Sequence, residues 1–192
     1  MVVVPCERKQ LKDFIETHHY SKSINGCRFS YGFLLLYDGE VIGAAFFGGM
    51  AMANQWKRFG SSDADVIELR RLCCIDNTPK NTESFFIGKM LKWLKKNTNH
   101  SVVVSYADQE YGHSGTIYKA SNFEYWGMQK GAKVIVYEDG RTFHDKTIRT
   151  KYKGKLKPFA ERVKQDLENG LAKYKNTAGK HTFVYFLTKK RK

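Results

Sequence analysis

The order of apolar runs and helix-like segments is the sequence feature that most constrains the fold. Val66 to Ile75 and Ser101 to Tyr106 are rich in β-branched and apolar residues, as is typical of strands. Between them, apolar residues recur at helical spacing from Phe86 to Leu94. This strand–helix–strand order predicts an α/β fold.

Other segments extend this order along the chain. Two apolar runs, Phe33 to Tyr37 and Val41 to Phe47, are joined across Asp38-Gly39, a favoured two-residue hairpin turn. We expect further helices at Cys6 to His18, at Gly115 to Asn122 and from Pro158 onward, and further strands at Val134 to Tyr137 and Phe183 to Leu187. The combined order predicts a mixed central sheet flanked by helices.

Positive charge is concentrated in the last quarter of the chain. The 192 residues carry 33 Lys and Arg against 19 Asp and Glu, a net charge of +14. Residues 141–192 account for 16 of these cations and 4 of the anions, a net +12, whereas residues 1–140 are nearly neutral. We therefore predict a core domain over residues 1–140 and a basic extension over residues 141–192 that packs on it and binds an anionic partner.

The extension contains an alternating basic and apolar stretch. Its cations, which have Tyr152 and Leu156 between them, are Arg149, Lys151, Lys153, Lys155 and Lys157. Lysine charges suit phosphates and an aromatic ring suits base stacking, so the stretch favours a nucleic acid as partner. A solvated basic face is the alternative interpretation. The sequence has no run of 18 apolar residues and no secretory signal pattern, so we expect a cytoplasmic protein that makes no membrane contact.

A polar segment, Asp76 to Ser84, leads from a predicted strand into a predicted helix. A helix start presents unpaired N–H groups and can bind an anion. Asn81 can cap the helix, and the Ser84 hydroxyl can bind either a phosphate or its own backbone.

Asp108 and Tyr118 are candidates for acid–base chemistry. Asp108 follows the strand Ser101 to Tyr106, and Tyr118 lies one turn into the next helix, so both side chains can face one cleft. Tyrosine can act as a general acid towards a leaving thiolate, and aspartate can orient or deprotonate an amine. A capping aspartate and a buried tyrosine are the alternatives.

Two further candidates lie elsewhere in the chain. His19 and Tyr20 follow the first helix, where a histidine can favour the helix dipole, bind a metal or transfer a proton. Arg71 lies in an apolar strand and, by alternation, shares a face with Leu69 and Cys73. A buried arginine needs a partner, either a carboxylate, Glu68 or Asp108, or an anionic ligand.

Several of these motifs occur together in the order found in one known family. Glu68-Leu-Arg-Arg-Leu72, Pro79-Lys-Asn-Thr-Glu-Ser84, Ser105-Tyr-Ala-Asp108 and Gly112-His-Ser-Gly-Thr-Ile-Tyr-Lys-Ala-Ser-Asn-Phe123, preceded by His19-Tyr20, resemble the Mom family of phage DNA modification proteins. The resemblance implies an acetyltransferase-like (GNAT) fold. It also implies an enzyme that converts adenine in double-stranded DNA to N6-carbamoylmethyladenine in the host cytoplasm, which protects phage DNA from restriction.

The resemblance also implies which residues are functional. By position, the functional residues of the family would correspond to His19, Tyr20, Tyr37, Arg71, Ser84, Asp108 and Tyr118. Ser84 and Tyr37 would bind the donor. The family has been linked to iron, for which His19, Tyr20 and Asp108 would be the ligands. The donor would be acyl-CoA-like or would otherwise carry phosphate, although the glycine-rich loop of acyl-CoA enzymes is missing here. An acyl-CoA-dependent N-acetyltransferase that acts on RNA, protein or a small amine is the alternative function.

Overall fold

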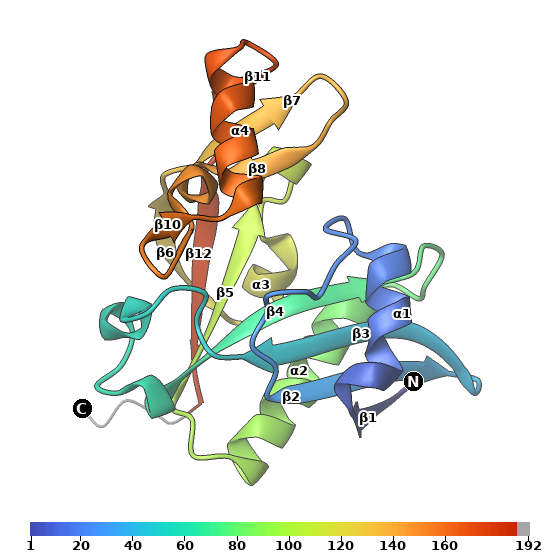
Figure 1. Ribbon diagram of the computed structural model, residues 1–192. Coiled ribbons are helices and arrows are strands. Elements are labelled where there is room, and N and C mark those ends of the chain that lie inside the picture. Colours follow the sequence, from blue (N-terminus) through green and yellow to red (C-terminus); the bar gives the residue numbers. More distant parts are fainter. Residues whose placement is uncertain (188–192) are drawn as a thin grey trace. The chain divides into compact units, whose positions relative to one another are not determined.

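The computed structural model describes residues 1–187, which form two compact units (Figure 1). The first, here called the sheet unit, comprises Met1–Ala107, His113–Gly127 and, among the described residues, 181–187. The second, the insert unit, comprises Asp108–Gly112 and Met128–Lys180. The structure therefore divides the chain at other positions than the boundary expected after residue 140. The last five residues of the predicted extension, 188–192, lie outside the described residues.

A seven-stranded sheet forms the centre of the sheet unit, with the strand order β1-β2-β3-β4-β5-β12-β6. The strands are β1 (Val2–Cys6), β2 (Tyr31–Tyr37), β3 (Glu40–Gly48), β4 (Val66–Cys74), β5 (Val102–Asp108), β6 (Glu124–Gln129) and β12 (Lys180–Phe186). The pairs β1–β2, β2–β3 and β3–β4 are antiparallel, whereas β4 and β5 are parallel. The prediction of a mixed sheet is therefore confirmed.

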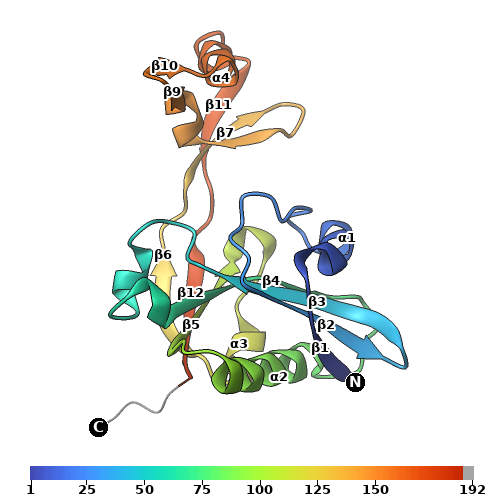
Figure 2. The same cartoon turned by 60° about the horizontal axis from the view of Figure 1, so that its bottom comes forward.

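Helices cover both faces of this sheet. They are α1 (Arg8–His18), α2 (Thr82–Asn97) and α3 (Thr116–Ala120). Buried Leu11 and Ile15 of α1 pack with Phe46 on one face, and buried residues of α2 pack with Phe33 and Phe47 on the other. Figure 2 shows α1 on one side of the sheet and α2 on the opposite side. Among the described residues, no helix is long and apolar enough to cross a membrane.

A β-bulge in β4 determines the face on which Arg71 lies. Phe46 and Phe47 of β3 lie opposite Arg71 and Leu69, so Arg70 is the extra residue of the bulge. Phe46 packs on the α1 side and Phe47 on the α2 side. The expectation that Leu69 and Arg71 share a face is therefore wrong, because one extra residue reverses the alternation.

The parallel strands β4 and β5 are paired only over their first residues. Their register runs from Val66 opposite Val102 to Glu68 opposite Val104. Beyond this point the two strands diverge, as Figure 1 shows. Arg71 lies on the divergent half of β4. Ligands of open α/β sheets bind near the carboxyl ends of parallel strands, so the divergence of β4 and β5 is a candidate site.

The insert unit has a small core of its own. Its elements are β7 (Lys133–Tyr137), β8 (Thr142–His144), β9 (Lys151–Tyr152), β10 (Lys155–Leu156), α4 (Pro158–Glu168) and β11 (Ala172–Asn176). A three-stranded sheet, β11-β7-β8, packs against α4 through Ile135, Val163 and Ala172. Pro158 is in the first turn of α4, as expected. Short 3₁₀ helices occur in both units. Those of the sheet unit are Gln55–Arg58 and Asp63–Asp65, and those of the insert unit are Gln109–Tyr111 and Asp145–Arg149.

Candidate functional site

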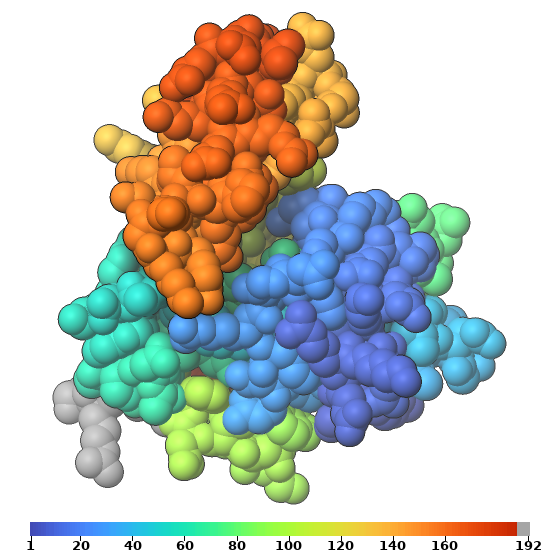
Figure 3. All heavy atoms as spheres, viewed as in Figure 1, coloured from blue at the N-terminus to red at the C-terminus, as the bar shows by residue number. Residues whose placement is uncertain are grey.

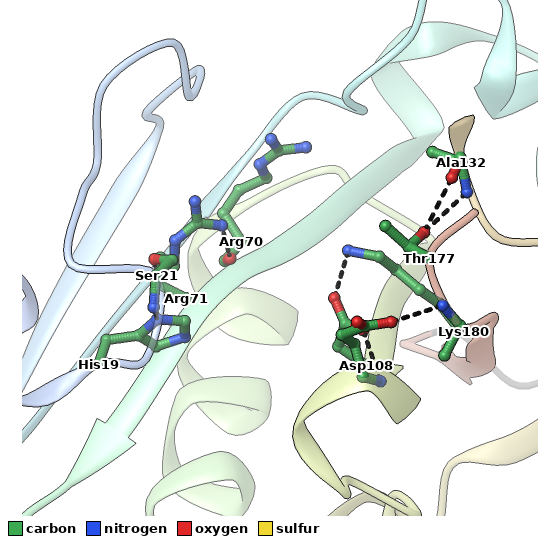
Figure 4. A network of polar contacts seen from close by, with 10 residues as sticks. His19, Ser21, Arg70, Arg71, Asp108, Ala132, Thr177 and Lys180 are labelled. Atoms are coloured by element: carbon green, nitrogen blue, oxygen red, sulfur yellow. Dashed lines mark hydrogen bonds and ion pairs between the residues drawn. The ribbon is translucent and has the colours of Figure 1, made fainter. Parts of the chain in front are cut away.

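His19 is held in one orientation by Ser21. It follows α1 directly, and its side chain is buried. The Nδ1 atom accepts a hydrogen bond from the Ser21 backbone N–H at 3.0 Å and lies 2.9 Å from the Ser21 hydroxyl (Figure 4). A backbone amide can only donate, so a neutral His19 carries its proton on Nε2. His19 is therefore prepared to donate a hydrogen bond from Nε2.

The surroundings of His19 favour this neutral form. Burial, together with the positive charges of Arg71, His113 and Lys22, lowers the pKa of His19 from its ordinary 6.5 to about 4. The interpretation of His19 as a cation that favours the α1 dipole is therefore not supported. In this neutral form the ring can still donate one hydrogen bond, from Nε2, to a carbonyl or a ring nitrogen.

Tyr20 extends the same cluster towards solvent. Its ring centroid lies 4.1 Å from that of His19 and 5.3 Å from that of His113. The side chain is 39% exposed. The neighbouring, mutually tilted rings of His19, Tyr20 and His113 give the sheet unit an aromatic surface that is partly open to a ligand.

Arg71 is a cation without a carboxylate partner in the described part of the chain. Its Nε donates to the Ser23 carbonyl at 3.3 Å, and its Nη1 donates to the Arg70 carbonyl at 2.7 Å. Glu68, a carboxylate beside it on β4, pairs instead with Arg70, at 2.8 Å. Both of those side chains are about nine-tenths buried. The positive charge of Arg71 thus remains available to an anionic ligand.

Asp108 lies at the end of β5, in the insert unit, and both of its oxygens have partners. Oδ1 accepts a hydrogen bond from the Glu110 backbone N–H at 3.1 Å, and Oδ2 pairs with Lys180 Nζ at 2.7 Å (Figure 4). The Asp108 side chain is 10% exposed, while that of Lys180 is 49% exposed. The capping role weighed for Asp108 is present, and the ion pair adds a second role.

Tyr118 lies in α3 of the sheet unit and is almost fully buried. Its ring centroid is 5.2 Å from that of Phe183 and 5.5 Å from that of Phe123. Burial is the main cause that raises the pKa of Tyr118 above its ordinary value. The negative charge of Glu68 also raises this pKa, whereas a hydrogen bond with the Ser105 side chain lowers it. The phenol therefore keeps its proton firmly, which suits a hydrogen-bond donor or a general acid.

Ser84 and Tyr37, the two residues predicted to bind the donor, do not join the ring cluster of His19, Tyr20 and His113. The Ser84 hydroxyl donates to the Asn81 carbonyl at 3.0 Å, which is the local bond weighed against a phosphate contact. Asn81 precedes α2 in a left-handed conformation, without a side-chain capping bond. Tyr37 ends β2 and is 42% exposed. In the described chain, neither residue makes a hydrogen bond, ion pair or ring contact with another predicted site residue.

The residues predicted to bind iron do not fit that role as they stand. Across residues 1–187 no group of three or more His, Cys, Asp and Glu residues is placed to hold a metal ion. Nδ1 of His19 accepts the Ser21 hydrogen bond and Nε2 of the neutral ring carries the proton, so neither nitrogen of this ring has a free lone pair. A metal ligand needs a free lone pair, so we assign no step to iron.

Two residues missed in the sequence complete these contacts. Ser21 lies two residues after His19, and this spacing could have indicated a local hydrogen bond between a side chain and the backbone. Lys180 is far from Asp108 in sequence, and no local sequence pattern predicts their ion pair. Only the strand order, in which β12 lies beside β5, brings these two residues together.

Comparison with solved structures shows the fold. A probable acetyltransferase from Staphylococcus epidermidis has a TM-score of 0.54 at 11% identity, covering 97% of this chain and 99% of its own. An N-acetyltransferase from Staphylococcus aureus gives 0.54 at 13% identity, covering 98% and 100%. A GNAT-family acetyltransferase from Streptococcus pneumoniae gives 0.52 at 9% identity, covering 97% and 99%. These likenesses confirm the predicted GNAT-like α/β fold.

Sequence comparison shows the family. The chain is 30% identical over 143 residues to a protein of Escherichia phage Mu, the methylcarbamoylase mom. This match covers 71% of the chain and 57% of the length of that relative. The Mom protein family itself matches residues 1–192. The chain thus belongs to the Mom protein family.

Proposed function

We propose that this protein is a transferase that modifies the N6 amine of adenine in DNA to N6-carbamoylmethyladenine. Membership of the Mom family over the whole chain carries the proposal, and the relative from phage Mu is named as a methylcarbamoylase. The match spans 57% of that relative's length. Modified adenine would protect phage DNA from restriction in the cytoplasm of the bacterial host.

The sheet unit supplies groups that suit a polar, anionic reactant. Neutral His19 offers an Nε2 proton, fixed in direction by Ser21. Arg71 offers a positive charge that no carboxylate of the described chain neutralises. Both interactions gain strength at a partly buried site, where water competes less for hydrogen bonds. We assign His19 and Tyr20 to substrate contact and Arg71 to the anionic part of a reactant.

Adenine N6 needs help to react, because its lone pair is delocalised into the ring. In duplex DNA it is also paired, so the base must leave the stack before it can be modified. Asp108 is the group we assign to N6, as a carboxylate that accepts a hydrogen bond from the amine. Its pairing with Lys180 fixes the position of the carboxylate. Tyr118 is assigned as the general acid because its phenol retains its proton.

The donor that we propose is acyl-CoA-like or another phosphate-bearing compound. Ser84 and Tyr37 are its assigned contacts, together with Arg71. For Ser84 this requires the hydroxyl to exchange its bond to the Asn81 carbonyl for a phosphate oxygen. The first turn of α2 also holds Glu83, whose negative charge opposes an anion there. Arg71 is therefore the stronger donor contact.

Double-stranded DNA is the partner assigned to the basic stretch of the insert unit. Its cations are Arg149, Lys151, Lys153, Lys155 and Lys157. The four lysines form no ion pair with a carboxylate within residues 1–187, whereas Arg149 pairs with Asp145 at 2.8 Å. Unpaired lysines are the groups that phosphates would neutralise, with release of counterions.

Mass spectrometry of nucleosides tests the activity. Plasmid DNA from cells that express the soluble protein should contain N6-carbamoylmethyladenine, and DNA from cells that express Asp108→Asn should contain far less. Tyr174→Phe, at an exposed position of the same unit, serves as the control and should leave the modified fraction unchanged. Unmodified adenine throughout, in the presence of folded protein, would refute the proposal.

The alternative activity, acyl-CoA-dependent N-acetylation of RNA, protein or a small amine, is separated by calorimetry. Its support is the fold alone, which the solved acetyltransferases share at 13% identity or less. Tight acetyl-CoA binding that is lost in Ser84→Ala, combined with unmodified plasmid DNA, would favour this alternative.

A further inference from the structure

The β9–β10 hairpin of the insert unit has an unusual turn. Lys151–Tyr152 pairs antiparallel with Lys155–Leu156, and only Lys153 and Gly154 connect the two strands. These two residues have φ angles of 47° and 80°. A two-residue turn with positive φ at both positions is compact, and its twist matches that of the flanking strands. The hairpin therefore ends in a narrow tip.

Lysine is an unfavourable residue for this tip. Left-handed backbone conformations crowd the Cβ atom of most residues, so such turns ordinarily carry Asn, Asp or Gly. Lys153 occupies the position at a conformational cost. What this residue contributes, and Asn or Gly would not, is a positive charge at the tip.

Tyr152 is surrounded by lysines on an open surface. Its side chain is 65% exposed, and Lys153 Nζ lies 5.6 Å from its ring centroid. Tyr152 lies opposite Lys155, and the bond from the Lys157 N–H to the Thr150 carbonyl continues the ladder, so Tyr152, Lys155 and Lys157 share a face. A hollow of about 650 Å³ is lined by Tyr152, Lys153, Lys155, Leu156, Lys157 and Pro158. Figure 3 shows the orange segment that contains the hairpin at the molecular surface.

We propose that this hairpin opens the DNA duplex: Tyr152 inserts into the base stack next to the adenine that leaves it, while Lys153, Lys155 and Lys157 hold the flanking phosphates. The inference rests on the proposed function, which requires an extruded adenine. Inserted side chains that partly unstack a duplex are an established way to deform DNA, and aromatic rings stack on bases of any sequence. The narrow tip, the exposed ring and the three neighbouring cations meet this requirement together.

Fluorescence of 2-aminopurine tests the proposal with the full chain. Duplexes that carry 2-aminopurine at each adenine position in turn should become brighter on binding, because the analogue fluoresces when it is unstacked. In Tyr152→Ala we expect most of this rise to be lost and DNA affinity to fall by about fivefold or more, whereas Tyr152→Phe should behave like the natural protein. The salt dependence of binding should stay the same in both variants, because neither changes the charge.

Tyr174→Ala is the matched control. Tyr174 also belongs to the insert unit, is 45% exposed and has a lysine, Lys133, 3.8 Å above its ring. Its removal should leave the rise unchanged. The proposal is overturned if Tyr152→Ala unstacks bases as well as the natural protein does, or if the natural protein binds duplexes without any rise. A rise that depends on Tyr152 without modified nucleosides would refute only the proposed activity, and modified nucleosides with an unchanged rise in Tyr152→Ala would refute only the role of the hairpin.

Discussion

At the residue scale, the Ser21 amide determines which ring nitrogen of His19 carries the proton. It occupies Nδ1, so the proton of the neutral ring is on Nε2. Nδ1 could bind a metal only after losing this hydrogen bond, and Nε2 only after losing its proton. The same geometry makes His19 a directed donor. This assignment needs the distance between two atoms, which the His-His-Tyr-Ser sequence alone does not provide.

The lowered pKa of His19 predicts how folding depends on pH. Its value is about 4 in the folded protein and 6.5 in the unfolded chain, so the unfolded state binds more protons between these values. His19 therefore contributes stability that is present above pH 6.5 and is lost as the pH falls towards 4. We expect a contribution of about 1 to 2 kcal/mol, discounted for partial solvent screening.

Urea unfolding at a series of pH values measures this contribution. The free energy of unfolding of the natural protein should fall more steeply from pH 6.5 to 4.5 than that of His19→Asn, which has no group titrating in this window. Parallel curves for the two proteins would show that His19 has an ordinary pKa in the folded state.

The buried pair of Glu68 and Arg70 carries a second prediction at this scale. Glu68 Oε2 also accepts a hydrogen bond from the Ala51 N–H at 3.2 Å, so this carboxylate links β4 to the loop after β3. Loss of one member leaves a buried charge without a partner, and Arg70→Met should lower the free energy of unfolding by about 3 to 5 kcal/mol. The double variant Glu68→Leu with Arg70→Met should recover part of this loss. Equal losses in the single and double variants would exclude a coupling between the two charges.

At the element scale, strands and helices with strong periodicity were predictable and their irregularities were not. The hairpin across Asp38-Gly39 and helix α2 follow directly from local pattern. Strand β1, Val2–Cys6, was missed because it is short and contains Pro5, which is tolerated here at a sheet edge. The bulge at Arg70 was also missed, because it depends on how β3 and β4 pair. These features are set by contacts between strands rather than by local sequence.

The start of α3 gives a prediction for an element. Gly115 precedes this helix with a φ of 77°, and a Cβ atom there would lie 2.1 Å from the Phe183 ring. Gly115→Ala therefore combines backbone strain with a steric clash, and we expect it to lower the free energy of unfolding by about 2 to 4 kcal/mol. Gly26→Ala is the control, since Gly26 has a φ of 71° and open space around it. It should cost about 1 kcal/mol. Equal losses in thermal or urea unfolding would show that Phe183 moves aside without cost.

At the scale of the whole molecule, the sequence predicted the fold class and the family. The concentration of charge after Arg141 predicted a C-terminal extension, whereas the insert unit comprises Asp108–Gly112 and Met128–Lys180, and the chain returns to the sheet at β12. Composition records where charges lie along the chain, whereas compact units depend on contacts. The ion pair of Asp108 with Lys180 was hidden for the same reason.

The lysines of the basic stretch in the insert unit predict how DNA binding depends on salt. Replacement of Lys151, Lys155 and Lys157 by Gln should reduce the slope of log affinity against log salt by about 0.9 for each phosphate that these lysines neutralise. Replacement of Lys92, Lys95 and Lys96, which are exposed on α2 of the sheet unit, is the control with the same change of charge. Titrations by fluorescence anisotropy at several salt concentrations measure both slopes. An equal reduction in the two triple variants would mean that only overall charge matters.

The position of β12 has a consequence for synthesis on the ribosome. This strand lies between β5 and β6 in the sheet but follows both of them in sequence, after the whole insert unit. While the insert is being translated, β5 and β6 have already emerged without the strand that separates them. Their exposed edges can pair with each other or with other chains. Translation speed through the insert, and chaperones that cover strand edges, should therefore affect the yield of soluble protein.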